Sequence, residues 1–132
     1  MLLLVVLAIA ACSTTGSRSA AASLPPVSAS PAVVLDSYLR ALVVGDCDMG
    51  RKLAMGTFRK GNGELCGETR VTAYQVQSDP AHPSSDEVVF ATTLTTTGTA
   101  DHSIEAGRMV WFYSLDRQPD GSWRIVGGGS GP

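Results

Sequence analysis

The chain has 132 residues, 44% of them hydrophobic and 17% charged, which is enough for one folded domain. Ten Lys and Arg residues against twelve Asp and Glu residues give a net charge of −2, which argues against binding to nucleic acid. The composition is globular and excludes a collagenous or wholly disordered chain.

The densest apolar run lies at the start of the chain. Residues 2–11 are all apolar, which is too short to span a bilayer but matches the core of a signal peptide. The run ends in Ile9-Ala10-Ala11-Cys12, which resembles the lipobox of bacterial lipoproteins. The resemblance implies that residues 1–11 are a signal peptide and that Cys12 carries the lipid, including an acyl chain such as palmitate.

This resemblance leaves alternatives open. No Lys or Arg precedes the apolar run, although signal peptides normally begin with a positive region. Either the true start lies upstream, or the terminal amine alone supplies the charge. The alternatives to lipidation are an ordinary signal peptide, cut after a small residue such as Ala22, and a chance match. We expect an exported protein held by its lipid on the outer face of the cytoplasmic membrane, in the cell envelope.

A polar segment follows Cys12. Residues 13–30 are rich in Ser, Thr, Ala, Gly and Pro, and Arg18 is their single charge. Such a stretch buries too little apolar surface to offset the entropy of ordering it. We therefore expect residues 12–30 to form a flexible lipidated tether and residues 31–132 to form one domain.

Helical signals open this domain. Ser30 is a suitable N-cap and Pro31 a suitable first helical residue. Apolar residues then recur at spacings of three and four up to Val43, and Gly45 is a suitable C-terminal cap. A second, shorter helix is expected from Cys47 to about Met55.

After Cys66 the apolar period changes to two, which predicts strands over 69–78, 87–97, 108–116 and 123–126. The strand over 108–116 is apolar on both faces, which predicts a central strand covered on both sides. The glycines at 127, 128, 129 and 131 are interpreted as a frayed tail. The expected fold class is α+β, with N-terminal helices packed on a curved, mainly antiparallel four-stranded sheet.

Two cysteines remain besides Cys12. Disulfides persist in exported proteins, so Cys47 and Cys66 are predicted to form a structural disulfide. A reactive or metal-binding pair is the alternative, but the chain has no Cys-x-x-Cys spacing and no clustered His. We predict neither a metal site nor a cofactor.

The pattern resembles a known superfamily. The helix from Pro31 to Leu42, the pair Cys47 and Cys66, and the final segment 120–126 resemble small exported proteins of the nuclear transport factor two-like (cystatin-like cone) superfamily, which abound as lipoproteins in actinobacteria. The resemblance implies a cone-like domain over about residues 31–132. The superfamily includes isomerases, dehydratases and ligand-binding modules, so the resemblance leaves the activity open.

Catalytic residues are hard to find in this sequence. Enzymes of that superfamily place a His or Asp base inside the cone, whereas His82 and His102 fall in polar loops. Asp46 and Asp48 are explained by helix capping. We therefore expect no enzymatic activity, with an isomerase or dehydratase of the cone type as the alternative.

Two groups of side chains are candidates for binding. Val110 and Phe112, on the second face of the central strand, are candidates for an interface with an envelope protein or a second copy. The function expected is that of a membrane-anchored exported lipoprotein with a non-catalytic ligand- or partner-binding domain, and the alternative is a structural, dimerising accessory domain. Candidates to line a cavity for a small apolar ligand, or simply to fill the core, are Tyr38, Tyr74, Phe90, Trp111 and Tyr113.

Overall fold

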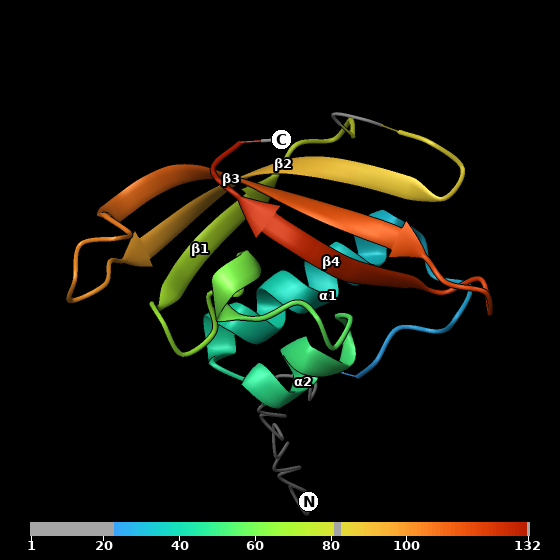
Figure 1. The fold of residues 1–132 in the computed structure, drawn as a ribbon, viewed down its shortest axis with the longest axis horizontal. Helices are drawn as coiled ribbons and strands as arrows, with labels where there is room; N and C mark the ends of the chain where they lie inside the picture. Colours follow the sequence, from blue (N-terminus) through green and yellow to red (C-terminus); the bar gives the residue numbers. More distant parts are fainter. Residues whose placement is uncertain (1–22, 81–82, 132) are drawn as a thin grey trace, which may run out of the picture.

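The computed structural model describes residues 23–80 and 83–131. Four antiparallel strands form one sheet in the order β1-β2-β3-β4, so each strand lies beside the next one in the chain. The helices precede the strands and lie on one side of the sheet (Figure 1). The elements are α1 (Pro31–Val44), α2 (Cys47–Lys52), the 3-10 turn η1 (Lys60–Asn62), β1 (Val71–Val76), β2 (Glu87–Thr97), β3 (Ala106–Arg117) and β4 (Trp123–Gly129).

Local signals at both ends define α1. The Ser30 side chain accepts a hydrogen bond from the Val33 amide, and Pro31 occupies the first turn. At the other end Gly45 adopts a left-handed conformation with φ of 76°, and its amide donates to the carbonyl oxygen of Leu42. The helix predicted from Ser30 to Gly45 is therefore confirmed.

The core forms where the inner face of the sheet meets α1. Tyr38 of α1 is fully buried, and its ring packs edge-on against Tyr113 of β3 and Phe58, with centroid distances of 5.5 and 5.9 Å. Such edge-to-face pairs add to the stabilisation from burial. Further fully buried side chains of this core come from α1, β2, β3 and β4 and include Leu35, Leu39, Leu94, Leu115 and Ile125.

The predicted fold class, with N-terminal helices packed on a cone-like sheet, is wrong. The domain is mostly β, because the strands have 6, 11, 12 and 7 residues while α2 has only 6 and α1 is the one helix of real length. The predicted second helix stops at Lys52 because residues 53–55 bind the edge of the sheet instead. The Met55 amide donates to the Ile125 carbonyl at 2.8 Å, and the Ile125 amide donates to the Leu53 carbonyl at 3.1 Å.

The predicted covering of both faces of β3 is also wrong. Tyr113 and Leu115 point to the core and are fully buried, whereas Val110, on the other face, is 51% exposed. No helix of the described residues lies over that other face (Figure 1). The pattern of a strand shows which of its residues are apolar on each face, but it does not show whether another layer of the chain covers both faces.

The glycines near the end of the chain belong to the sheet and are not a frayed tail. β4 runs to Gly129, and residues 127–129 pair with Ser114, Tyr113 and Phe112. A Cβ atom on Gly128 would lie 2.8 Å from the Trp111 indole nitrogen and 3.3 Å from the Gly63 carbonyl oxygen. Close packing therefore requires a glycine at position 128 of β4.

Candidate functional site

The predicted disulfide is confirmed. Cys47, the first residue of α2, is bonded to Cys66, five residues before β1, and their Cα atoms are 5.7 Å apart. The bond therefore closes a loop that contains Phe58 and η1, and it joins the start of α2 to the segment before β1. Cys12, the predicted signal peptide and His82 lie outside the described residues.

The five aromatic candidates for a cavity lining do not share one cavity. Tyr38, Phe90 and Tyr113 are 0, 2 and 0% exposed and fill the core, with Phe90 and Tyr113 opposite each other on β2 and β3. Tyr74 and Trp111 are half-buried. The burial of Tyr38, Phe90 and Tyr113 assigns them to the core, which the sequence analysis gave as the alternative to a cavity lining.

The phenol groups of the core have different hydrogen-bonding states. The Tyr38 hydroxyl donates to Glu64 Oε1 at 2.8 Å, whereas the Tyr113 hydroxyl has no partner among the described residues. Burial raises the pKa of both tyrosines, and the nearby Glu64 carboxylate raises each further. Both side chains are therefore neutral at physiological pH and cannot serve as bases there.

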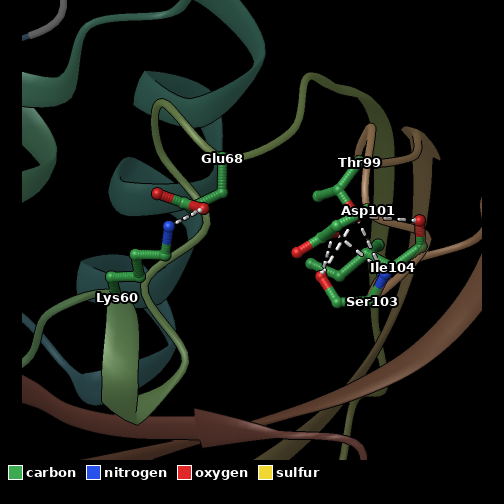
Figure 2. A network of polar contacts seen from close by, with 6 residues as sticks. All are labelled: Lys60, Glu68, Thr99, Asp101, Ser103 and Ile104. Carbon is green, nitrogen blue, oxygen red and sulfur yellow. Dashed lines mark hydrogen bonds and ion pairs between the residues drawn. The ribbon is translucent and has the colours of Figure 1, made fainter.

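A polar groove of about 230 Å³ lies between the η1 loop and the β2–β3 loop. Figure 2 shows its two walls: Lys60 pairs with Glu68 at 2.9 Å on one side, and Thr99 and Ser103 surround Asp101 on the other. Both walls are loops with no apolar period, so the sequence analysis missed this groove.

The groove is polar without being an acid–base centre. Hydrogen bonds from Thr99 and Ser103 lower the pKa of Asp101 to about 2, so this carboxylate is ionised at physiological pH. Trp111 lines the groove as well, but its indole nitrogen is buried against Gly128 and has no hydrogen-bond partner in the described part of the chain. These groups can hold polar atoms through hydrogen bonds and charge.

The remaining titratable candidates are surface groups. Asp46 caps α2 by accepting a hydrogen bond from the Met49 amide at 3.0 Å, as predicted. Asp48 forms an ion pair with Arg51. His102 is exposed in the β2–β3 loop, where its φ of 58° marks a tight turn. Among residues 23–80 and 83–131, no three side chains of His, Cys, Asp or Glu are grouped to hold a metal ion.

The side of the sheet away from α1, here called the outer face, holds the two predicted interface residues. Val110 and Phe112 alternate on β3 with core residues and lie beside Thr93 and Ala91 of β2 in the pairing register. Val110 is exposed and Phe112 half-buried. On the same side of β3, a cation and an anion flank this pair. The residues at positions 108, 110, 112, 114 and 116 are Arg, Val, Phe, Ser and Asp.

Comparison with known proteins shows only a shared fold. No protein-family model matches the chain, and no curated protein matches it. Among solved structures, the chain is similar to the solution structure of a SEC-C motif containing protein from Rhodopseudomonas palustris, with a TM-score of 0.58 over 81% of this chain and 83% of that one. The two sequences are 12% identical. The superfamily resemblance drawn from the sequence thus stays a prediction.

In the described part of the chain, no helix is long and apolar enough to cross a membrane.

Proposed function

We propose that this chain is an exported lipoprotein, anchored in the cell envelope through Cys12, whose domain is a non-catalytic binding module. The support for the anchor is the apolar run that ends in Ala10-Ala11-Cys12. The bond between Cys47 and Cys66 supports export, because structural disulfides belong to oxidising compartments. The two observations are independent, since one lies in the first twelve residues and the other in the folded domain.

Fatty-acid labelling tests the anchor. Cells producing the chain are fed a labelled fatty acid, and the labelled protein is isolated and compared with the Cys12→Ser variant. Label on the wild type that is lost in Cys12→Ser supports lipidation. Equal label on both proteins, or label on neither, contradicts it. The Ala22→Ser variant, which alters the alternative cleavage site, serves as the control and keeps its label.

The binding surface we propose is the outer face, and its occupant is a second copy of the chain. The observation that carries this proposal is the order of residues along β3, in which Arg108 and Asp116 lie four residues on either side of Phe112. A two-fold axis that passes by Phe112 and reverses the strand direction places each Arg108 opposite the partner's Asp116. Self-complementary surfaces of this kind are the rule in symmetric dimers, and sheets pack face to face at about 10 Å.

The size of the outer face sets the expected affinity. Strands of about ten residues span roughly 35 Å, and four strands are roughly 19 Å wide. Because β1 and β4 are shorter than β2 and β3, we estimate about 600 Å² per copy, against about 800 Å² for a stable complex of standard size. The dimer is therefore expected to be weak in free solution and to benefit from anchoring of both copies on one membrane.

Cysteine cross-linking tests the dimer in the full-length protein. Phe112→Cys places a thiol beside the axis, so mild oxidation is expected to yield a covalent dimer. Val44→Cys, at the exposed end of α1, is the matched control and stays monomeric. A Phe112→Cys protein that remains monomeric, or equal cross-linking at position 44, contradicts the proposal.

Charge exchange tests the register of the same dimer. In the Phe112→Cys background, Arg108→Asp places two carboxylates together and Asp116→Arg places two guanidinium groups together, so each change lowers cross-linking. The combined exchange restores the opposite charges and is expected to restore cross-linking. A double variant that cross-links no better than either single variant contradicts the pairing of Arg108 with Asp116.

A further inference from the structure

The tether reaches the domain along an edge that exposes apolar side chains. Leu24 and Val27 are 49 and 56% exposed, although residues 24–27 are held against the domain. They form one wall of a groove of about 170 Å³, and the other wall includes Leu53 and Trp123. The segment, blue in Figure 1, lies on the helical side of the sheet, away from the outer face.

Cations flank this apolar edge. Arg124 of β4 lines the same groove, and its guanidinium donates to the carbonyl oxygen of Lys52 at the end of α2. Lys52 is exposed, and in the part of the chain that the structure describes neither Lys52 nor Arg124 has a carboxylate within ion-pair distance. Two acidic residues lie near Arg124: Asp116 is opposite it in the β3–β4 register, and the Asp120 carboxylate accepts hydrogen bonds from Ser122.

The chain continues this pattern beyond Lys52. Met55 is 37% exposed, and Arg59 follows it on the surface. Residues 49–63 contain four basic residues. Arg51 and Lys60 pair with Asp48 and Glu68, which leaves Lys52 and Arg59 without an ion-pair partner among the described residues. An exposed apolar side chain among cations is the composition that favours the interface of an anionic membrane.

We propose that the surface formed by residues 24–27, 51–55 and 123–124, here called the tether edge, docks on an anionic phospholipid bilayer. The proposal rests on the proposed lipid anchor at Cys12. Ten residues separate Cys12 from Ser23, and a chain of that length spans at most about 40 Å in any conformation. The anchor therefore keeps Leu24 and Val27, the first exposed apolar side chains after it in the described chain, within about 40 Å of the lipid headgroups.

The charge on the lipid distinguishes docking from anchoring. A lipid anchor inserts into neutral and anionic bilayers alike, because its free energy comes from buried acyl chains. Each cation of the tether edge that reaches an anionic surface raises the ratio of docked to undocked protein about fivefold. Docking should therefore depend on lipid charge and salt, while the anchoring itself should depend on neither.

Trp123 supplies a reporter inside the tether edge. The lipidated full-length protein with Trp111→Phe retains Trp123 as its single tryptophan. It is incorporated into vesicles of phosphatidylcholine, or of equal parts phosphatidylcholine and phosphatidylglycerol, in which the lipids carry bromine as a fluorescence quencher. Flotation of the vesicles measures the anchor, and quenching of Trp123 measures docking.

The expected result is flotation with both vesicles but strong quenching only with phosphatidylglycerol. Lys52→Ala lowers the ratio of docked to undocked protein about fivefold, and Arg70→Ala, an equal loss of charge beside β1 at the opposite edge of the sheet, leaves it unchanged. Adding salt to about 0.5 M abolishes the quenching of Trp123 in the protein whose tether edge is unchanged. Flotation with equal quenching in both lipids, or equal effects of Lys52→Ala and Arg70→Ala, overturns the docking surface. Failure to float on either vesicle instead refutes the anchor.

Discussion

Removing the disulfide should cost the domain a large part of its stability. Cys47 and Cys66 are 19 residues apart, and the chain-entropy model assigns a cross-link of that loop size about 3 kcal/mol. A domain of this size is stable by roughly 5–15 kcal/mol. The loop also holds Leu53, Phe58 and Leu65, which are buried in the core and become harder to place once the loop is open. We therefore expect Cys47→Ala/Cys66→Ala to fold with its unfolding free energy lowered by about 3 kcal/mol.

Urea denaturation followed by tryptophan fluorescence measures this loss. With a denaturant dependence of about 2 kcal/mol per molar urea, the midpoint should fall by about 1.5 M. Reductant should move the wild-type curve to that of the double variant and leave the double variant unchanged, which controls for the two substitutions themselves. A loss below about 1 kcal/mol would refute the reasoning, because the core contacts of the loop would then fix it without the bond.

Three further predictions concern packing and charge. Gly63→Ala should lower the unfolding free energy by about 2 kcal/mol or more, because the new Cβ meets the Gly128 backbone and Gly63 has a φ of 95°. A loss below about 0.5 kcal/mol, the size expected of a surface substitution, contradicts this close approach. Tyr38→Phe should cost about 1.5 kcal/mol through its lost hydrogen bond to a carboxylate, whereas Tyr113→Phe removes an unpartnered hydroxyl and should cost almost nothing in the same urea titration. The pKa of Asp101 is lowered from 3.8 to about 2, so its contribution to stability is present above pH 3.8 and is lost as the pH falls to about 2. Asp101→Asn should therefore lose less unfolding free energy than the wild type between pH 4 and 2. Equal losses in the two proteins would contradict this.

The sequence predicted the elements of this fold better than their arrangement. Ser30, Pro31 and Gly45 mark the ends of α1 through local chemistry, and the alternation in residues 87–97 gives β2 its observed bounds. Local signals succeed here because capping and pleating involve residues close together in the chain. The class was wrong because the end of α2 is decided by a distant strand, whose Ile125 binds Leu53 and Met55.

Parts of the candidate surfaces were open to prediction and others were not. Alternation alone placed Val110 and Phe112 on the second face of the strand, and the structure has them on the face away from the core. Their role in an interface stays a prediction. The polar groove beside Lys60 and Glu68 was missed, since its walls come from two loops that are distant in sequence. The tether edge was missed for a similar reason, because Arg124 reaches Lys52 only through the packing of β4 against the end of α2.

The two proposed surfaces constrain each other through the geometry of the sheet. Opposing Arg108 to the partner's Asp116 requires a two-fold axis that runs across the strands, from β1 towards β4, between the two outer faces. Rotation about that axis reverses the strands but keeps both β4 edges on the same side of the dimer. Trp123 and Arg124 of the tether edge belong to β4, so both copies can dock on one bilayer with the axis along the membrane normal.

An axis parallel to the strands gives the opposite outcome. It would place Arg108 opposite the partner's Arg108 and send the two β4 edges in opposite directions, so only one copy could reach the membrane. The charge order along β3 and the position of the tether edge therefore select the same dimer independently. Cross-linking of Phe112→Cys should accordingly rise when the lipidated protein is moved from detergent to phosphatidylglycerol-containing vesicles, because anchoring confines both copies in the matching orientation. Lower cross-linking on vesicles than in detergent would show that the two surfaces are incompatible.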